Sequence, residues 1–200
     1  MRDNHYFSSI IMKNSDVKEI YNFVDEIIST QKSCCTKGCS YCCHQQIEVQ
    51  NIEKRVITNY IKDNLEEQTK DVIRKDLEVW LDYFDQNTPD DKILTSKDVF
   101  IDFRNKSAKV GLKCPFLINN ACSIYPMRPQ ACRIHIVEEN PQLCNESKLR
   151  DSTKFAREIK DTLVEDLKKR EQISIEPLAY VVKDIFLPER KLKPMEKVVL

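Results

Sequence analysis

Glycine is nearly absent from this chain of 200 residues, which contains only Gly38 and Gly111. Dinucleotide-binding folds and phosphate-binding loops need several glycines close together, because their backbone turns tightly and approaches a phosphate closely. Neither motif can be built from this sequence in its usual form. Nucleotide-dependent chemistry on such a fold is therefore disfavoured.

The chain also lacks an excess of either charge, since 32 basic residues balance 32 acidic ones. This balance leaves no electrostatic footprint for nucleic acid or for an anionic membrane. The sequence contains no apolar run of about 18 residues and no stretch typical of a signal peptide near its start. We therefore expect a cytoplasmic location, no nucleic-acid or membrane partner, and an unidentified protein or redox partner.

Cysteine, in contrast, is abundant, with nine residues. A chain of this length can bury a hydrophobic core without cross-links, so disulfides are not needed for folding. In a reducing compartment such thiols bind metal or carry out redox chemistry more often than they form a stable disulfide framework. The odd number of cysteines also favours metal binding or redox chemistry over a complete set of disulfides.

The spacing of the apolar residues predicts a mainly α fold, a helical domain with a cysteine-rich metal-binding core and a small β-hairpin. We expect one domain over 1–200, with the cysteine region at about 34–135 and a loose tail at 188–200. Helices are predicted from Ser15 or Asp16 to Ile28, over 51–86 as one or two helices, from Ser152 to Leu167, and over 177–186.

Three shorter segments lie around the second group of cysteines. Residues 99–103 are too few for periodicity to separate strand from helix. Residues 114–125 predict a hairpin, because two apolar runs flank Asn119 and Asn120, which tolerate the positive φ of a tight turn. Pro129 suits the first turn of a short helix that continues to Ile134.

The cysteines fall into two groups. The first has the pattern CxxxCxxCC, formed by Cys35, Cys39, Cys42 and Cys43, and the second comprises Cys114, Cys122, Cys132 and a more distant Cys144. On a regular helix the first group would share one face, yet its ends would lie ~12 Å apart along the axis, whereas a Zn–S bond measures about 2.3 Å. Either the segment breaks at Gly38 or the second group closes the site, and we favour closure by the second group.

Adjacent thiols such as those of Cys42 and Cys43 project in different directions on a helix, so they suit two metals or two corners of a polynuclear cluster. Four thiolates around Zn²⁺ or a [4Fe-4S] core carry roughly two net negative charges, which nearby cations should offset. Candidate cations and neighbouring histidines are Arg128, Arg133, Lys37, Lys113, His44 and His135. The histidines could be ligands, hydrogen-bond donors to the ligands, or ordinary surface residues.

Cys34 and Cys144 lie outside the compact patterns, and we interpret them as ordinary small residues rather than ligands. On this interpretation, Cys42→Ser or Cys132→Ser loses metal, whereas Cys144→Ser is nearly silent.

The segments "CTKGCSYCC", residues 35 to 43, and "CPFLINNACSIYPMRPQACRIH", residues 114 to 135, resemble the YkgJ-type cysteine cluster family, the zinc- or iron-chelating CxxCxxCC domain. The resemblance implies that the metal or cofactor ligands are Cys35, Cys39, Cys42, Cys43, Cys114, Cys122 and Cys132. Flagellin lysine N-methylases are distantly similar, but this chain is short by comparison and has no glycine-rich cofactor loop.

Three functions follow as hypotheses. The first is an iron-sulfur protein, [4Fe-4S] being the preferred cluster, that serves electron transfer or a redox-linked modification. The second is a zinc-binding structural or interaction module. The third is an enzyme, a transferase or oxidoreductase with a free cysteine as nucleophile, for which the sequence assigns no catalytic residue.

Overall fold

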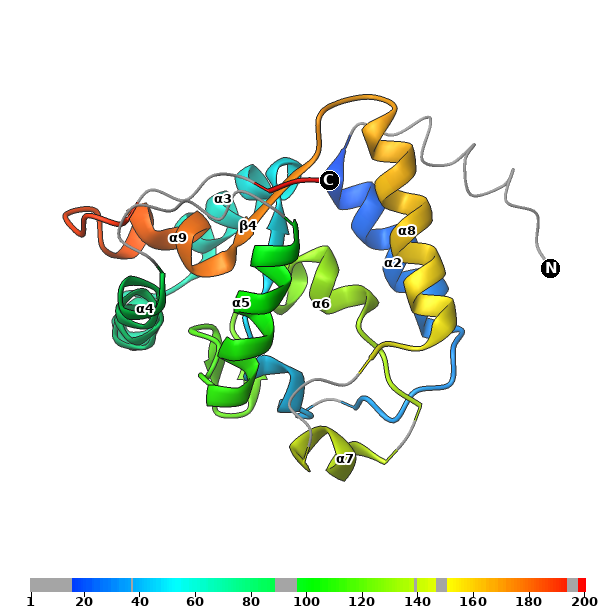
Figure 1. Cartoon of the computed structure of the whole chain (residues 1–200), viewed down its shortest axis with the longest axis horizontal. Coiled ribbons are helices and arrows are strands. Elements are labelled where there is room, and N and C mark those ends of the chain that lie inside the picture. Colours follow the sequence, from blue (N-terminus) through cyan, green and yellow to red (C-terminus); the bar gives the residue numbers. More distant parts are fainter. Residues whose placement is uncertain (1–15, 37, 89–96, 139, 147–150, 194–197) are drawn as a thin grey trace.

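The computed structural model describes residues 16–36, 38–88, 97–138, 140–146, 151–193 and 198–200. Eight α-helices lie within these ranges and make the fold mainly α, as the apolar spacing predicts. They are α2 (Val17–Ser29), α3 (Lys54–Asn64), α4 (Glu67–Asn87), α5 (Lys97–Val110), α6 (Gln130–Ile134), α7 (Pro141–Glu146), α8 (Lys154–Lys168) and α9 (Leu178–Phe186). Figure 1 shows α2 and α8 on one side, α3, α4, α5 and α9 on the other, and the short α6 between them.

The helix boundaries follow from local chemistry. Asp16 caps α2, because its carboxylate accepts a hydrogen bond from the backbone N–H of Lys18; Ser15, the other candidate cap, lies outside the described residues. The stretch 51–86 divides into two helices at Leu65 and Glu66, whose backbones are extended. The ambiguous segment 99–103 is helical and belongs to α5.

A three-stranded antiparallel sheet connects distant parts of the chain. Its order is β1-β4-β5, with β1 (Glu48–Gln50), β4 (Ser174–Pro177) and β5 (Val198–Val199). Strands of two to four residues are too short to show a clear alternation of apolar and polar residues. The sequence pattern therefore gives no signal of this sheet.

The chain end differs from the loose tail that we expected over 188–200. Val198 is only 2% exposed, and β5 pairs with Ser174 and Ile175 of β4. The Arg190 guanidinium lies 2.7 Å from the carboxylates of both Asp82 and Asp85 on α4. Backbone pairing and these ion pairs attach the described part of the segment, and neither leaves a signal in the local sequence.

The predicted hairpin is present. Strands β2 (Leu117–Ile118) and β3 (Ala121–Cys122) pair antiparallel. Asn119 and Asn120 join them with φ values of 51° and 58°, as a primed two-residue turn requires. The turn places Cys122 opposite Leu117, on the strand that leads toward α6.

Two hydrophobic clusters hold the helices. The larger cluster contains Trp80, Phe84, Phe103, Phe116 and Phe186, and joins α3, α4, α5, α9, the hairpin and the sheet. The smaller cluster packs Ile20 and Val24 of α2 against Ile159 and Leu163 of α8, and includes Ile134 at the end of α6. Because Cys114 belongs to the larger cluster, the second cysteine segment runs from one core to the other.

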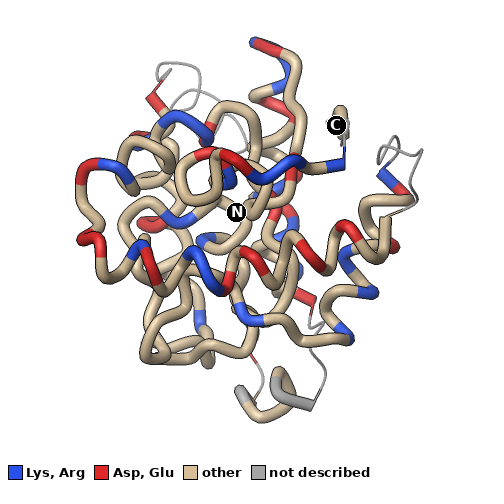
Figure 2. Tube along the Cα trace, turned by 90° about the vertical axis from the view of Figure 1, so that its left-hand side faces the viewer, with Lys and Arg blue, Asp and Glu red and all other residues tan. Residues whose placement is uncertain are grey.

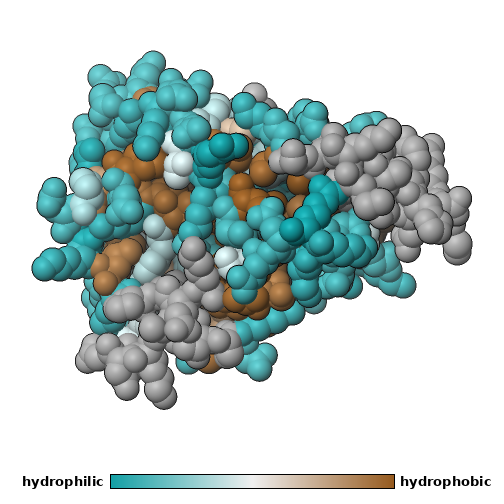
Figure 3. Space-filling model, turned by 90° about the horizontal axis from the view of Figure 1, so that it is seen from above, coloured by the Kyte–Doolittle hydropathy of each residue, from teal (hydrophilic) through white to brown (hydrophobic). Residues whose placement is uncertain are grey.

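The surface is mixed in charge and polarity. Basic and acidic residues are interspersed along the chain (Figure 2), and the apolar patches of the face in Figure 3 are separated by polar residues. Within the described ranges, no helix combines the length and the apolar character that a bilayer crossing demands.

The hairpin turn gives a test of the fold. We expect Asn120→Ala to lower the free energy of unfolding by about 1 kcal/mol, because alanine pays the steric cost of positive φ that asparagine partly avoids. Asn120→Gly is the matched control and should keep or raise stability. Urea unfolding of the three proteins measures both effects, and equal stability of the alanine and glycine variants would contradict the turn geometry.

Candidate metal centre

The first cysteine segment is not a regular helix. At its centre Gly38 has φ +89°, and the Cys39 N–H donates to the Thr36 carbonyl at 2.9 Å, which closes a turn. Residues Tyr41–Cys43 then form a short 3-10 helix, η1. The break at Gly38, one of the two alternatives left open by the sequence, is therefore present, and the limit that a helix places on these thiols does not apply.

The second cysteine segment closes onto the first. The backbone N–H of Cys114 donates to the carbonyl of Cys43 at 2.7 Å. At the other end, the N–H of Cys34 donates to the carbonyl of Val137, just beyond α6, at 2.8 Å. Both alternatives, the break and the closure, thus occur together.

All seven cysteines of the expected ligand set line one cleft of about 1760 Å³. These are Cys35, Cys39, Cys42, Cys43, Cys114, Cys122 and Cys132. Over the part of the chain that the structure describes, no three His, Cys, Asp or Glu side chains converge on a single point where an ion would sit. The thiols surround a space instead. As soft sulfur donors, they are the ligand type that suits zinc or an iron-sulfur core.

Four of these thiols act on one another electrostatically; Cys114 is buried, and Cys42, Cys122 and Cys132 are half-buried. Burial raises the pKa of Cys114 to about 12, and burial followed by the charges of Cys114, Cys42 and Cys122 raises the pKa of Cys132 well above its usual value. Hydrogen bonding to Cys43, then burial, raises the pKa of Cys42. We call Cys42, Cys114, Cys122 and Cys132 the inner thiols. They are protonated at neutral pH without metal, so each must release its proton to bind one.

Arginines supply the positive charge that a thiolate site needs. Burial raises the pKa of Cys42, Cys122 and Cys132, and the positive charge of Arg128 lowers the pKa of all three. The charge of Arg133 also lowers the pKa of Cys122. The predicted role of the two arginines therefore has a spatial basis. Lys113 instead pairs with Asp76 at 2.7 Å, and Lys37 lies outside the described residues.

Cys34 and Cys144 do not line the cleft, but they lie beside cysteines that do. Burial raises the pKa of Cys34, and the charges of Cys35 and Cys144 add to the rise. Burial likewise raises the pKa of Cys144, reinforced by Cys35 and Cys39. This placement was not expected, because both cysteines lie outside the compact patterns of the sequence.

Both predicted histidines have polar contacts within the fold. Nδ1 of His44 lies 3.1 Å from the Ser40 carbonyl, across η1. Nδ1 of His135 lies 2.9 Å from the hydroxyl of Ser152, just before α8, and burial lowers its pKa. In these positions the rings support the backbone on either side of the cysteine segments.

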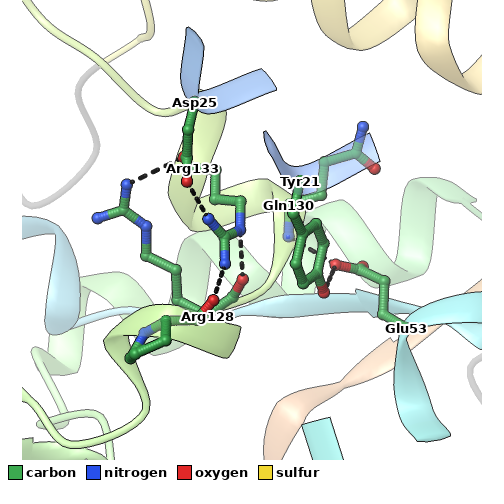
Figure 4. A network of polar contacts seen from close by, with 7 residues as sticks. Tyr21, Asp25, Glu53, Arg128, Gln130 and Arg133 are labelled. Carbon is green, nitrogen blue, oxygen red and sulfur yellow. Dashed lines mark hydrogen bonds and ion pairs between the residues drawn. The ribbon is translucent and has the colours of Figure 1, made fainter. Parts of the chain in front are cut away.

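A buried arginine holds the loop that leads to Cys132 (Figure 4). Arg133 pairs with Asp25 of α2, and its guanidinium donates to the carbonyls of Pro126 and, at 3.0 Å, Arg128. Its Cζ lies 4.0 Å from the centre of the Tyr21 ring, a cation–π contact. The guanidinium of Arg133 thus holds the loop before α6 in place and connects it to α2.

Glu53 lies on the other side of Tyr21. Its Oε1 accepts hydrogen bonds from the Tyr21 hydroxyl and the Gln130 N–H, each at 2.6 Å, and Oε2 accepts one from the Gln50 N–H at 2.9 Å. The side chain is buried, which raises its pKa against the opposing effect of these donors. Sequence reasoning missed Tyr21, Glu53 and Asp25, because none of them lies near a cysteine in the sequence.

The comparison with protein families agrees with this arrangement. A family model designated CxxCxxCC and described as "Putative zinc- or iron-chelating domain" matches residues 33–149, more than half of the chain. The chain belongs to the CxxCxxCC family. Its resemblance to that family is thereby confirmed, and its general function is to chelate zinc or iron. Neither the curated proteins nor the solved structures contain a significant match.

One feature of the chain departs from the family's name. Its first two motif cysteines, Cys35 and Cys39, are separated by three residues rather than two. The turn at Gly38, closed by the bond from Cys39 to Thr36, accommodates the longer spacing.

The three donors around Glu53 lead to a prediction. In Glu53→Gln the single amide oxygen cannot replace both carboxylate oxygens, so at least one buried N–H loses its acceptor. We expect the free energy of unfolding in urea to fall by about 1–3 kcal/mol. Because the Gln130 N–H lies at the start of the helix that bears Cys132, metal retention during dialysis should fall as well.

The matched control is Glu67→Gln. That carboxylate lies on the exposed surface of α4 and pairs with nearby Lys70, so its loss should change stability by no more than about 0.5 kcal/mol. If the two glutamine variants unfold at the same urea concentration as the parent protein, Glu53 does not hold the site.

Proposed function

We propose that the chain is an iron-sulfur protein and that Cys42, Cys114, Cys122 and Cys132 ligate one [4Fe-4S] cluster. The main support for this proposal is that these four thiols come from the two cysteine segments, line one cleft and act on one another electrostatically. Four cysteine thiolates are the usual ligand set of such a cluster. When bound, the cluster would supply one-electron redox chemistry.

The spread of the thiols supports a cluster over a single ion. Four sulfurs bound to one zinc would lie only about 3.8 Å from one another, given Zn–S bonds of about 2.3 Å in a tetrahedron. The described cysteines surround a cleft without converging on one point. A core of four irons holds its thiolates farther apart than a single zinc ion does.

The charges near the inner thiols support the same proposal. A four-thiolate [4Fe-4S]²⁺ site carries about two negative charges, and Arg128 and Arg133 lie where they favour thiolates. The Asp25 carboxylate pairs with both guanidiniums, and Nη2 of Arg128 lies 3.5 Å from its Oδ1. The Arg128 guanidinium also lies over the ring of Tyr125. Held in this way, the arginines would tune the potential of the cluster.

The use that we propose is electron transfer or a redox-linked modification with a protein partner. The cleft beside the inner thiols opens to solvent, so a partner can approach the cluster. Cys43, whose thiol hydrogen-bonds to that of Cys42, would stay near the cluster without ligating it and would influence its potential through this contact.

The second candidate is a zinc-binding module, which the family description favours equally with iron. In that case the thiols would converge when zinc binds, and the closed site would stabilise the domain without redox chemistry.

Anaerobic purification followed by optical spectroscopy and metal analysis separates the two functions. The iron-sulfur proposal predicts a brown protein with a broad visible absorption, about four irons and four acid-labile sulfides per chain, and bleaching by dithionite. A colourless protein whose inner thiols retain only zinc would overturn it.

The ligand assignment has its own test. Cys132→Ser should lose most of the iron, sulfide and visible absorption, because it removes an inner thiolate. Cys144→Ser is the matched control, with the same substitution at a cysteine outside the cleft, and should keep the absorption per chain. Equal loss of absorption in both variants would contradict the division between inner and other cysteines.

A further inference from the structure

The cleft that the cysteines line extends beyond them, to the space between α5 and α8. Figure 1 shows these two helices on opposite sides of the molecule, with α6 between them. Side chains from both helices and from β1 line this part of the cleft, among them Glu48, Arg104 and Lys160. The proposed metal centre uses none of these three residues.

One carboxylate connects the two walls. Oε1 of Glu48 lies 2.8 Å from Nη1 of Arg104 on α5, and Oε2 lies 3.2 Å from Nζ of Lys160 on α8. Two cations therefore share one anion, which leaves one positive charge at this place. The other charged residues of this part of the cleft balance one another, with Lys97, Arg157 and Lys168 against Asp151, Asp161 and Glu165.

The positive charge extends to His135, which lines the same cleft. Burial lowers the pKa of His135, and the charges of Arg104 and Lys160 lower it further, while the charge of Asp151 opposes them. The wall between α5 and α8 therefore has a positive potential that favours an anion.

A buried amide lines the cleft near this carboxylate. The side chain of Gln46 is only 4% exposed. Ile47 and Val49 pack on the larger hydrophobic cluster, so the alternation along an extended chain directs Gln46 and Glu48 to the other side. Among the described residues, neither Nε2 nor Oε1 of Gln46 has a hydrogen-bond partner. Because native proteins rarely leave a buried amide unpaired, this amide indicates a molecule that binds in the cleft.

Arg104 keeps one edge of its guanidinium for a second acceptor. Glu48 pairs with Nη1, and within the described ranges Nε of Arg104 has no hydrogen-bond partner. Nε and Nη2 form the edge through which a guanidinium binds a carboxylate with two parallel hydrogen bonds. The side chain is 33% exposed, so a ligand can approach it from the cleft.

We propose that the cleft between α5 and α8 binds a small organic carboxylate that also carries an amide or hydroxyl group. The carboxylate would pair with Arg104 and Lys160, and the amide or hydroxyl group with the Gln46 side chain, which offers both donors and an acceptor. Glu48 would repel the second negative charge of a phosphate group, which favours the singly charged carboxylate. The inference does not depend on which metal the inner thiols bind.

N-acetylglycine, which carries a carboxylate next to an amide, is the probe that tests the proposal. Isothermal titration calorimetry of the metal-loaded protein at constant ionic strength should give a Kd of about 1 mM or lower. Acetate and inorganic phosphate should bind more weakly. The proposal is wrong if N-acetylglycine does not bind at about 20 mM, or if either of the other anions binds as tightly.

Variants of the two cations locate the bound carboxylate. Arg104→Lys should weaken binding by about tenfold or more although the charge is kept, because lysine cannot offer two parallel donors. Lys160→Gln should weaken binding as well. Lys154→Gln is the matched control on the same helix, at a residue outside the cleft that pairs with Glu158, and should bind as the parent does. Parent-like affinity in both Arg104→Lys and Lys160→Gln would place the ligand elsewhere, such as on the metal, and would overturn the proposal.

Gln46→Met separates a role in binding from a role in folding. Methionine has a similar length and no amide that needs a partner, so this variant should unfold at a higher urea concentration than the parent protein. Its affinity for N-acetylglycine should fall to that for acetate, because the amide of the ligand loses its partner. A lower urea midpoint with unchanged affinity would show that Gln46 serves only the fold and would contradict the proposal.

Discussion

The buried carboxylate of Glu53 is the contact on which the cysteine region depends. Its two oxygens join Tyr21 of α2, the backbone of Gln50 at the end of β1, and the first residue of α6. Buried polar groups need hydrogen-bond partners within the protein. These segments therefore cannot separate without leaving the carboxylate and its donors unpaired. Arg133 adds a parallel connection from α6 to Asp25 of α2.

This connection fixes where the thiols lie. The short helix α6 contacts α2, α8 and β1, and it presents Cys132 toward the cleft, while the hairpin packed on the larger core presents Cys114 and Cys122. The first segment is then attached at both ends by backbone hydrogen bonds. A site assembled in this way has rigid walls contributed by two hydrophobic clusters, and its interior can remain polar and reactive.

Local patterns predicted the elements that have strong local causes. The helical stripes, the Asp16 cap and the asparagine turn follow from periodicity and from the backbone preferences of single residues. The β1-β4-β5 sheet and the attachment of the chain end depend on pairing between residues more than 20 positions apart. Likewise, Tyr21 and Glu53 contribute through partners that no neighbouring sequence motif indicates.

The sequence by itself determined the kind of chemistry. The chain has nine cysteines, and most of them lie in two segments that match the family. The residue type and its spacing are properties of the sequence, so the sequence alone specifies soft thiolate donors in separate segments. Only the tertiary structure decided which thiols are neighbours. The turn at Gly38 lets Cys35 and Cys39 line the same cleft as Cys42, and α7 brings Cys144 near the first cysteine segment. Proximity across such distances depends on packing and on long-range hydrogen bonds, and these bring the two cysteine segments to one cleft.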